Sequence, residues 1–267
     1  MVELERLDLL GGATAEAVGS RIAGVSERTD ALAGATHVQE CVPETVAAKS
    51  AVFGWLDTEA DAGAVLASSS TGIKPSAFTE GLAGRGRCLV THPINPPYLV
   101  PAVELVPAPW TEDTAMKRTR ALMERIGQAP ISMAREIDAF VMNRLQGALL
   151  QEAFWLVDNG YASVEDVDRG LAEGIGLRWS FIGPLETIDL NAPGGIRDYV
   201  AGYGGMYLEL AQTRGEPAPW TGTPLDAVES ECRASLPLEK IADRQAWRDR
   251  RLMALAAHKR KLGIEEG

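Results

Sequence analysis

Short apolar runs alternate with longer amphipathic segments through the first half of the chain. The runs have the length of buried strands, and the segments between them show helical spacing. Strands that alternate with helices are typical of a doubly wound parallel sheet, so we predict an α/β fold. The predicted strands are residues 37–42, 64–68, 87–90, 103–106 and 131–133, and the predicted helices are residues 1–10, 14–23, 44–56, 110–126 and a short one after Pro75.

The second half of the chain has the pattern of an all-helical domain. Residues 139–159 form a segment that is apolar on most of its surface, and Gly160 follows it at the position of a C-cap. Ser163 is a typical N-cap for the next helix. The change of pattern divides the chain into residues 1–136, a sheet domain, and residues 137–267, a helical C-terminal domain. Further helices are predicted at residues 184–190, 196–213, 224–235 and 242–262.

Composition and charge narrow the class of protein. The 267 residues are 46% hydrophobic and 24% charged, which is an ordinary globular mixture. The net charge of −11 argues against a nucleic-acid partner, which requires a basic surface. The apolar segment 139–157 carries polar residues such as Arg144 and Glu152, so it predicts a core helix and no membrane partner.

The cysteines and the first residues bear on the compartment. Cys41, Cys88 and Cys232 lie far apart and form no CxxC pair, which predicts free thiols and no metal site. Free thiols are typical of a reducing compartment, so we expect a cytoplasmic protein. Residues 1–6 lack the basic and apolar regions of a secretory leader, and we expect none.

One histidine stands in a context that suggests catalysis. His92 ends the apolar run 88–90, a proline-rich corner follows, and Glu104 lies in the apolar run that comes next. A chain that leaves a strand, turns and returns beside itself brings such a pair together. The carboxylate then orients the imidazole, which acts as a general base. A histidine before a proline is otherwise often a structural residue.

The residues around His92 resemble a known family signature. The block THPINPPY at residues 91–98, followed by VELVP at residues 103–107, is similar to the 3-hydroxyacyl-CoA dehydrogenase superfamily, in its lambda-crystallin (L-gulonate 3-dehydrogenase) branch. Further similar blocks are HVQECVPE at 37–44, residues 66–76, FVMNRLQ at 140–146 and RWSFIGPLET at 178–187. The resemblance implies an NAD-dependent oxidoreductase with a Rossmann-like domain and a helical C-terminal domain that forms a homodimer.

The start of such a domain is not found in the sequence. No strand followed by G-x-G-x-x-G occurs, and neither does the acid that distinguishes NAD from NADP. Loss of a central strand would expose on the order of 500 Å² of apolar surface, worth roughly 12 kcal/mol. We therefore expect the Rossmann-like domain to be N-terminally truncated here, with the longer enzyme beginning roughly fifty residues earlier, the length of the missing unit.

The resemblance assigns roles to four residues around the reacting carbon. His92 matches the catalytic base that takes the proton of the 3-hydroxyl, and Glu104 matches its partner, although an exposed acid on an edge strand is the alternative. Asn143 lies on the apolar helix and matches the amide that meets the substrate's carbonyl oxygen. Thr71 stands where a catalytic serine is usual. Threonine keeps the hydroxyl of serine and adds a methyl group.

The resemblance also assigns binding residues. Ser70 is a substrate-binding candidate, with a structural Ser/Thr turn as the alternative. Glu44 and Lys49 match residues along the nicotinamide ribose and the substrate entrance, and would otherwise be charges on a solvated helix. Asn95 matches the cofactor-binding asparagine beside the histidine, with a turn role as its alternative.

The substrate is indicated by weaker signals. Acyl-CoA members, which act in fatty acid metabolism, usually carry two aromatic residues after the histidine, whereas Pro93 and Ile94 follow it here. This difference resembles the branch that acts on free hydroxy acids, and Arg178 is a candidate to bind a carboxylate or an ordinary surface arginine. We expect a small polar L-3-hydroxy acid; the alternatives are an acyl-CoA substrate and an inactive crystallin-like protein.

Overall fold

The computed structural model describes residues 1–213 and 220–262. These residues form two compact units. The first comprises residues 1–145 and 248–262, and the second comprises residues 146–213 and 220–247. The expected domain boundary after residue 136 falls between the last strand and the first long helix of the second half.

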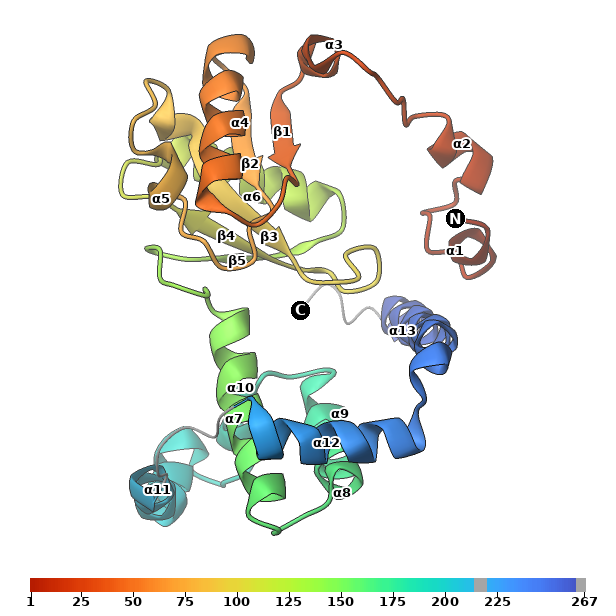
Figure 1. The fold of residues 1–267 in the computed structure, drawn as a ribbon, viewed down its shortest axis with the longest axis vertical. Helices are drawn as coiled ribbons and strands as arrows, with labels where there is room; N and C mark the ends of the chain where they lie inside the picture. The colour runs from red at the N-terminus through yellow and green to blue at the C-terminus, as the bar shows by residue number, and fades with distance from the viewer. Residues whose placement is uncertain (214–219, 263–267) are drawn as a thin grey trace. The chain divides into compact units, whose positions relative to one another are not determined.

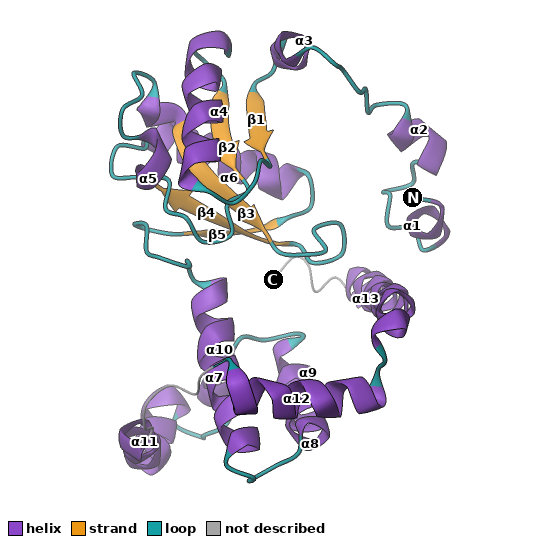
Figure 2. Ribbon diagram, viewed as in Figure 1, coloured by secondary structure: helices purple, strands orange, loops and turns teal. Residues whose placement is uncertain are grey.

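The first unit is built on a five-stranded sheet (Figure 1). Its strands lie in the order of the sequence, and β1, β2 and β3 are parallel to one another. Figure 2 shows all the strands of the described chain in this one sheet. The strands are β1 (His37–Glu40), β2 (Val65–Ser68), β3 (Cys88–Pro93), β4 (Ala102–Pro107) and β5 (Ala129–Ser132).

The sheet is not parallel throughout, which differs from the simplest expectation. β4 runs antiparallel to β3, and β5 then runs parallel to β4. Only residues 94–101 connect β3 to β4. A parallel return requires a crossover of about a dozen residues or more, so this short connection forces a hairpin. The α/β Rossmann-like class is confirmed, with a mixed sheet whose last two strands point the other way.

Helices cover both faces of the sheet. α4 (Val46–Glu59) packs Phe53 and Leu56 against Leu66 and Val90 on one face. α6 (Asp113–Arg125) packs Ala115 against the opposite face, where Val65, Ala67 and Leu89 point. Figure 1 shows these two helices on opposite sides of the strands. Successive strand residues alternate between the faces, so β2 and β3 are buried on both, and each strand begins with a run of apolar residues.

The other elements of the first unit are short, apart from one long helix. The expected helix 1–10 is shorter, and a helix at residues 28–32 was not predicted. Leu4, Leu99 and Met253 form a small apolar cluster that joins the first helix to the β3–β4 connection and to the last helix. These elements are α1 (Val2–Arg6), α2 (Ala15–Gly19), α3 (Arg28–Leu32), α5 (Ser76–Thr79), η1 (Arg85–Arg87) and the part of α13 (Ile241–Leu262) from residue 248 on.

The described residues of the second unit form helices and the turns that connect them, with no strand among them. The expected Ser163 cap is present, since its hydroxyl accepts a hydrogen bond from the Asp166 amide at 3.1 Å. In the residues that the structure describes, no helix has the length and apolar character of a membrane span. Its elements are α7 (Met142–Asp158), which begins in the first unit, α8 (Val164–Arg169), the π-helical turn η2 (Gly170–Ile175), α9 (Gly176–Trp179), α10 (Pro184–Leu190), α11 (Gly195–Thr213), α12 (Gly222–Ser235) and η3 (Leu238–Lys240).

Phe53 should be a main source of stability of the first unit. Its side chain is 0% exposed and its ring meets Phe78 edge to face, 4.8 Å between centroids. We expect Phe53→Ala to lower the free energy of unfolding by about 3–5 kcal/mol in urea titrations, because it leaves a cavity in a packed core. Val46→Ala, an exposed apolar residue of the same helix, should cost less than about 1 kcal/mol. A Phe53→Ala cost as small as that of the control would contradict this description of the core.

Candidate active site

The hairpin of β3 and β4 brings His92 and Glu104 face to face. The two residues are direct partners in the antiparallel register. The Nδ1 atom of His92 lies 2.8 Å from Oε2 of Glu104. The carboxyl group is fully buried and the histidine is 7% exposed. Glu104 is therefore not an exposed edge-strand acid, and the pair has the geometry of a base with its orienting carboxylate.

The second oxygen of Glu104 binds backbone. Its Oε1 accepts hydrogen bonds from the amides of Val141 at 2.8 Å and Met142 at 2.9 Å, at the start of α7. Burial by itself raises the pKa of the Glu104 carboxyl, but the hydrogen bonds from His92 and from these two amides outweigh it and hold the pKa below its usual value. The group is thus kept as a carboxylate, which accepts a hydrogen bond from the imidazole and orients the ring.

The backbone just before α7 has an unusual conformation. Ala139 and Phe140 have φ angles of 61° and 54°, in the left-handed region that residues with a Cβ rarely occupy. The Phe140 side chain is 0% exposed, and its ring centroid lies 5.9 Å from that of His92. Phe140 therefore forms an apolar wall beside the imidazole. Phe140 was not among the predicted site residues, although it belongs to a sequence block that resembles the family.

Asn143 and Thr71 lie in contact near His92 and Glu104. The Nδ2 atom of Asn143, in the first turn of α7, donates a hydrogen bond to the Thr71 backbone oxygen at 2.6 Å. Thr71 is exposed, in the connection that follows β2. Because an amide nitrogen carries two hydrogens, one Asn143 donor is left for another partner.

Ser70 has a different environment from its neighbour. It is 0% exposed, and its hydroxyl donates to Oε1 of Glu44 at 2.6 Å and accepts from the Ile73 amide at 3.0 Å. These contacts are those of the structural Ser/Thr turn named as its alternative. Of the two adjacent hydroxyls, Thr71 is the one that solvent reaches.

Glu44 fixes the loop that carries Thr71. Besides Ser70, its Oε1 accepts hydrogen bonds from the amides of Thr71 at 2.9 Å and Gly72 at 3.2 Å. Burial by itself raises the pKa of the Glu44 carboxyl, but the bonds from Ser70, Lys49 and the Gly72 amide hold it below its usual value. The side chain is still 41% exposed, so one edge of the carboxylate faces solvent.

Lys49 is buried, unlike a charge on a solvated helix. Its side chain is 1% exposed, and Nζ lies 3.1 Å from Oε2 of Glu44 and 3.2 Å from Oε2 of Glu40. Ser68 contributes a third contact at 3.3 Å. Glu40 and Ser68 were not among the predicted site residues, although both lie in sequence blocks that resemble the family.

The last two candidates lie in separate places. Asn95 is exposed in the β3–β4 connection, three residues after His92. Arg178 is exposed on α9 of the second unit. Their binding roles stay predictions. Within residues 1–213 and 220–262, no group of three or more histidine, cysteine and acidic side chains has the arrangement of a metal site.

Two family models cover most of the chain. The model described as "3-hydroxyacyl-CoA dehydrogenase, NAD binding domain" matches residues 2–137, and the one described as "3-hydroxyacyl-CoA dehydrogenase, C-terminal domain" matches residues 140–227. The chain belongs to the 3-hydroxyacyl-CoA dehydrogenase family. Its recognition from the sequence and the choice of NAD as cofactor are thereby confirmed.

Relatives place the chain in the crystallin-like branch of this family. It is 45% identical to the lambda-crystallin homolog of Bos taurus over 95% of this chain and 79% of that protein. It is 36% identical to L-carnitine dehydrogenase of Streptomyces griseus, over 92% of this chain and 72% of that one. Among solved structures, an NAD+-dependent dismutase described as FHMPC 5-dehydrogenase has a TM-score of 0.73 and 27% identity, covering 91% of this chain and 77% of the other.

The residues of the site suit the nicotinamide half of NAD. The exposed edge of the Glu44 carboxylate is an acceptor for ribose hydroxyls, and the exposed Asn95 amide offers donors and an acceptor. The G-x-G-x-x-G pattern that binds a pyrophosphate does not occur in the 267 residues.

The left-handed conformation of Ala139 has a measurable cost. We expect Ala139→Gly to raise the free energy of unfolding by up to about 1 kcal/mol, because glycine adopts φ of 61° without the Cβ clash. The larger conformational entropy that glycine loses on folding offsets part of this gain. The reverse exchange is the control. Gly160→Ala, at φ of 70° with open space around the new Cβ, should lower stability by about 1 kcal/mol. Destabilisation by Ala139→Gly in urea titrations would contradict the strain at this position.

Proposed function

We propose that this protein is an NAD-dependent dehydrogenase of L-3-hydroxy acids that uses His92 as its general base. The observation that carries the proposal is the 2.8 Å contact between His92 Nδ1 and the buried Glu104 carboxylate. Because the carboxylate only accepts hydrogen bonds, Nδ1 carries the proton and Nε2 presents its lone pair. Nε2 is thus the atom that takes a proton from a substrate hydroxyl.

The residues of the site have different roles in the proposed reaction. His92 removes the proton of the 3-hydroxyl, and Glu104 stabilises the imidazolium that forms. When bound, NAD supplies the hydride acceptor for the hydrogen on C3. In the opposite direction, the His92 imidazolium donates its Nε2 proton to the carbonyl oxygen. The wall formed by Phe140 excludes water on one side of the imidazole, which strengthens its bond to Glu104.

Asn143 and Thr71 position the substrate in this proposal. One Asn143 N–H is used by the Thr71 carbonyl, which leaves the other for the carbonyl oxygen of the substrate's carboxyl group. The exposed Thr71 hydroxyl offers a second hydrogen bond. Glu44 and Asn95 contact the nicotinamide end of the cofactor, and Lys49 keeps Glu44 in place. Ser70 contributes to substrate binding only through the shape of the loop.

We propose a free hydroxy acid as the substrate in preference to a thioester. Pro93 and Ile94 follow the histidine where acyl-CoA enzymes usually carry aromatic residues. The similarity to L-carnitine dehydrogenase supports this choice, because L-carnitine is a free hydroxy acid. Arg178 is the proposed carboxylate ligand, since its guanidinium suits a bidentate bond.

Comparing kcat/KM for a 3-hydroxy acid and for its CoA thioester tests the choice of a free acid as substrate, and a preference for the thioester would overturn it.

Glu104 should be required for the correct tautomer of His92. In Glu104→Gln the side-chain oxygen stays with the Val141 and Met142 amides, so the amide nitrogen faces His92 and donates to Nδ1. The proton then moves to Nε2 and the base is lost. We expect kcat in an NADH absorbance assay to fall by about 10⁴-fold, as for the same acid-to-amide change of an orienting residue elsewhere, and to fall at least as far in His92→Gln.

The crystallin-like alternative makes the opposite prediction for these variants. Its support is the similarity to lambda-crystallin homologs, whose name implies no reaction. A protein without catalysis would show no rate above background in any form, and no dependence on His92. The matched control is Thr114→Ala, an exposed hydroxyl on α6 remote from His92, which should leave kcat unchanged.

We propose in addition that the protein is cytoplasmic and acts as a homodimer through its C-terminal helices. Cys41 is a free, exposed thiol, as expected in a reducing compartment. α11 bears an exposed apolar stripe with alternating spacings of four and three residues, which is the pattern of a helix that packs against another helix. The stripe comprises Ile196, Val200, Tyr203, Tyr207 and Leu210.

A charge in the middle of this stripe should separate the subunits. Val200 is 53% exposed and lies between Ile196 and Tyr203. We expect Val200→Glu to raise the dissociation constant of the dimer at least tenfold, measured by light scattering after gel filtration, because two charges would be buried in an apolar contact. Leu238→Glu, an exposed leucine of η3 outside the stripe, is the control and should leave the mass unchanged. A monomeric wild-type protein would refute the proposed dimer.

A further inference from the structure

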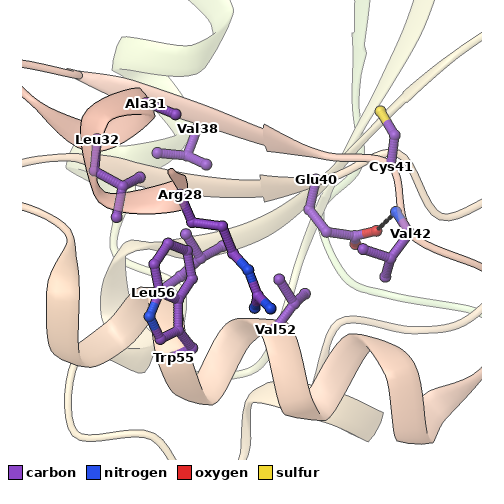
Figure 3. A pocket seen from close by; sticks show the side chains of 10 residues that line it. All are labelled: Arg28, Ala31, Leu32, Val38, Glu40, Cys41, Val42, Val52, Trp55 and Leu56. Atoms are coloured by element: carbon purple, nitrogen blue, oxygen red, sulfur yellow. Dashed lines mark hydrogen bonds between the residues drawn. The ribbon is translucent and has the colours of Figure 1, made fainter. Parts of the chain in front are cut away.

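A buried acid at the end of β1 is not used by the proposed reaction. The Glu40 side chain is 1% exposed, and it points from the strand toward α4 (Figure 3). Its carboxylate accepts hydrogen bonds from the Val42 amide, drawn in Figure 3, and from the Ser68 hydroxyl at 2.6 Å. Both oxygens also lie within reach of the Lys49 ammonium, at 3.2 and 3.4 Å.

The surroundings of Glu40 leave Lys49 as its cationic partner. A cavity of about 230 Å³ opens beside Glu40, lined mostly by apolar side chains such as Leu32, Val38 and Val52. Arg28 lines the same cavity, but its guanidinium lies over the Trp55 ring, 5.5 Å from the centroid. Isolated buried charges are strongly disfavoured, so the Glu40 carboxylate and the Lys49 ammonium compensate for each other's burial.

Lys49 connects the buried Glu40 carboxylate to the candidate active site. The same ammonium lies 3.1 Å from Oε2 of Glu44, and Oε1 of Glu44 accepts from the amides of Thr71 and Gly72. The Thr71 carbonyl in turn accepts from Asn143. An uninterrupted series of charge-assisted and backbone hydrogen bonds therefore joins the buried strand end to the loop with the free hydroxyl.

We propose that Glu40 is a positioning residue: through Lys49 and Glu44 it fixes the loop of residues 70–72 and so the hydroxyl of Thr71 and the amide of Asn143. The part that concerns substrate rests on the proposed function, whereas the positioning of the loop does not. Without the Glu40 charge, the ammonium has a single carboxylate partner, one that faces solvent. Lys49 and Glu44 then relax outward, and the loop amides lose their acceptor.

The test is amide hydrogen exchange, read by NMR, in the full chain carrying Glu40→Gln. We expect exchange at the Thr71 and Gly72 amides to accelerate at least tenfold relative to wild type, with less than twofold change at Leu89 and Val90. kcat/KM for the hydroxy acid should fall about tenfold, and the midpoint of its pH profile should stay, because His92 and Glu104 are untouched. Ser68→Ala keeps both charges and should accelerate hydrogen exchange at the Thr71 and Gly72 amides by about threefold. This variant replaces Glu40→Gln in the test if Glu40→Gln does not fold.

The matched control is a second semi-buried ion pair of the same unit. Asp57 binds Arg87 at 3.2 Å and the Gly84 amide, at the opposite ends of α4 and β3 from the loop. Asp57→Asn should destabilise the fold without accelerating exchange at Thr71 or Gly72. Unchanged exchange at these amides in both Glu40→Gln and Ser68→Ala, or equal acceleration in Asp57→Asn, overturns the proposal. Acceleration in a protein that shows no dehydrogenase activity supports the positioning role and counts against the proposed function alone.

Discussion

The carboxylate of Glu104 is the contact on which the candidate site depends. One oxygen orients the His92 imidazole, and the other accepts the two amides that begin α7. The same group therefore sets the tautomer of the base and fixes the start of the helix that carries Asn143. A neutral side chain cannot serve both purposes, because one of its atoms would have to donate where both positions require an acceptor.

The burial of this carboxylate explains the features around it. A lone buried charge is costly, and here three donors compensate, one from a side chain and two from the backbone. To present those two amides, the chain passes through left-handed conformations at Ala139 and Phe140. The second of these residues also places its ring beside the imidazole. Local strain of this kind persists where the surrounding contacts determine it.

Much of the fold follows from the sequence, because its signals are local. Apolar runs of strand length mark β2 and β3, and the short proline-rich connection requires the hairpin that pairs His92 with Glu104. Residues far apart are harder to predict. Nothing in the local pattern shows that Lys49 is buried between Glu40 and Glu44, since a lysine on a helix is usually solvated. The left-handed pair before α7 escapes prediction too, because neither residue is glycine.

The four hydroxyl residues that follow one another at the end of β2 are alike in chemistry and different in surroundings. Ser68 faces Glu40, Ser69 faces Gln39, Ser70 faces Glu44, and Thr71 is exposed. Their surroundings are set by position along the strand and loop, and not by the type of side chain. Serine and threonine can therefore replace each other at the exposed position with little disturbance. Insertion or deletion of one residue would instead shift every hydroxyl by one position, so that each would face the partner of the adjacent residue. This segment therefore tolerates substitution far better than a change in length.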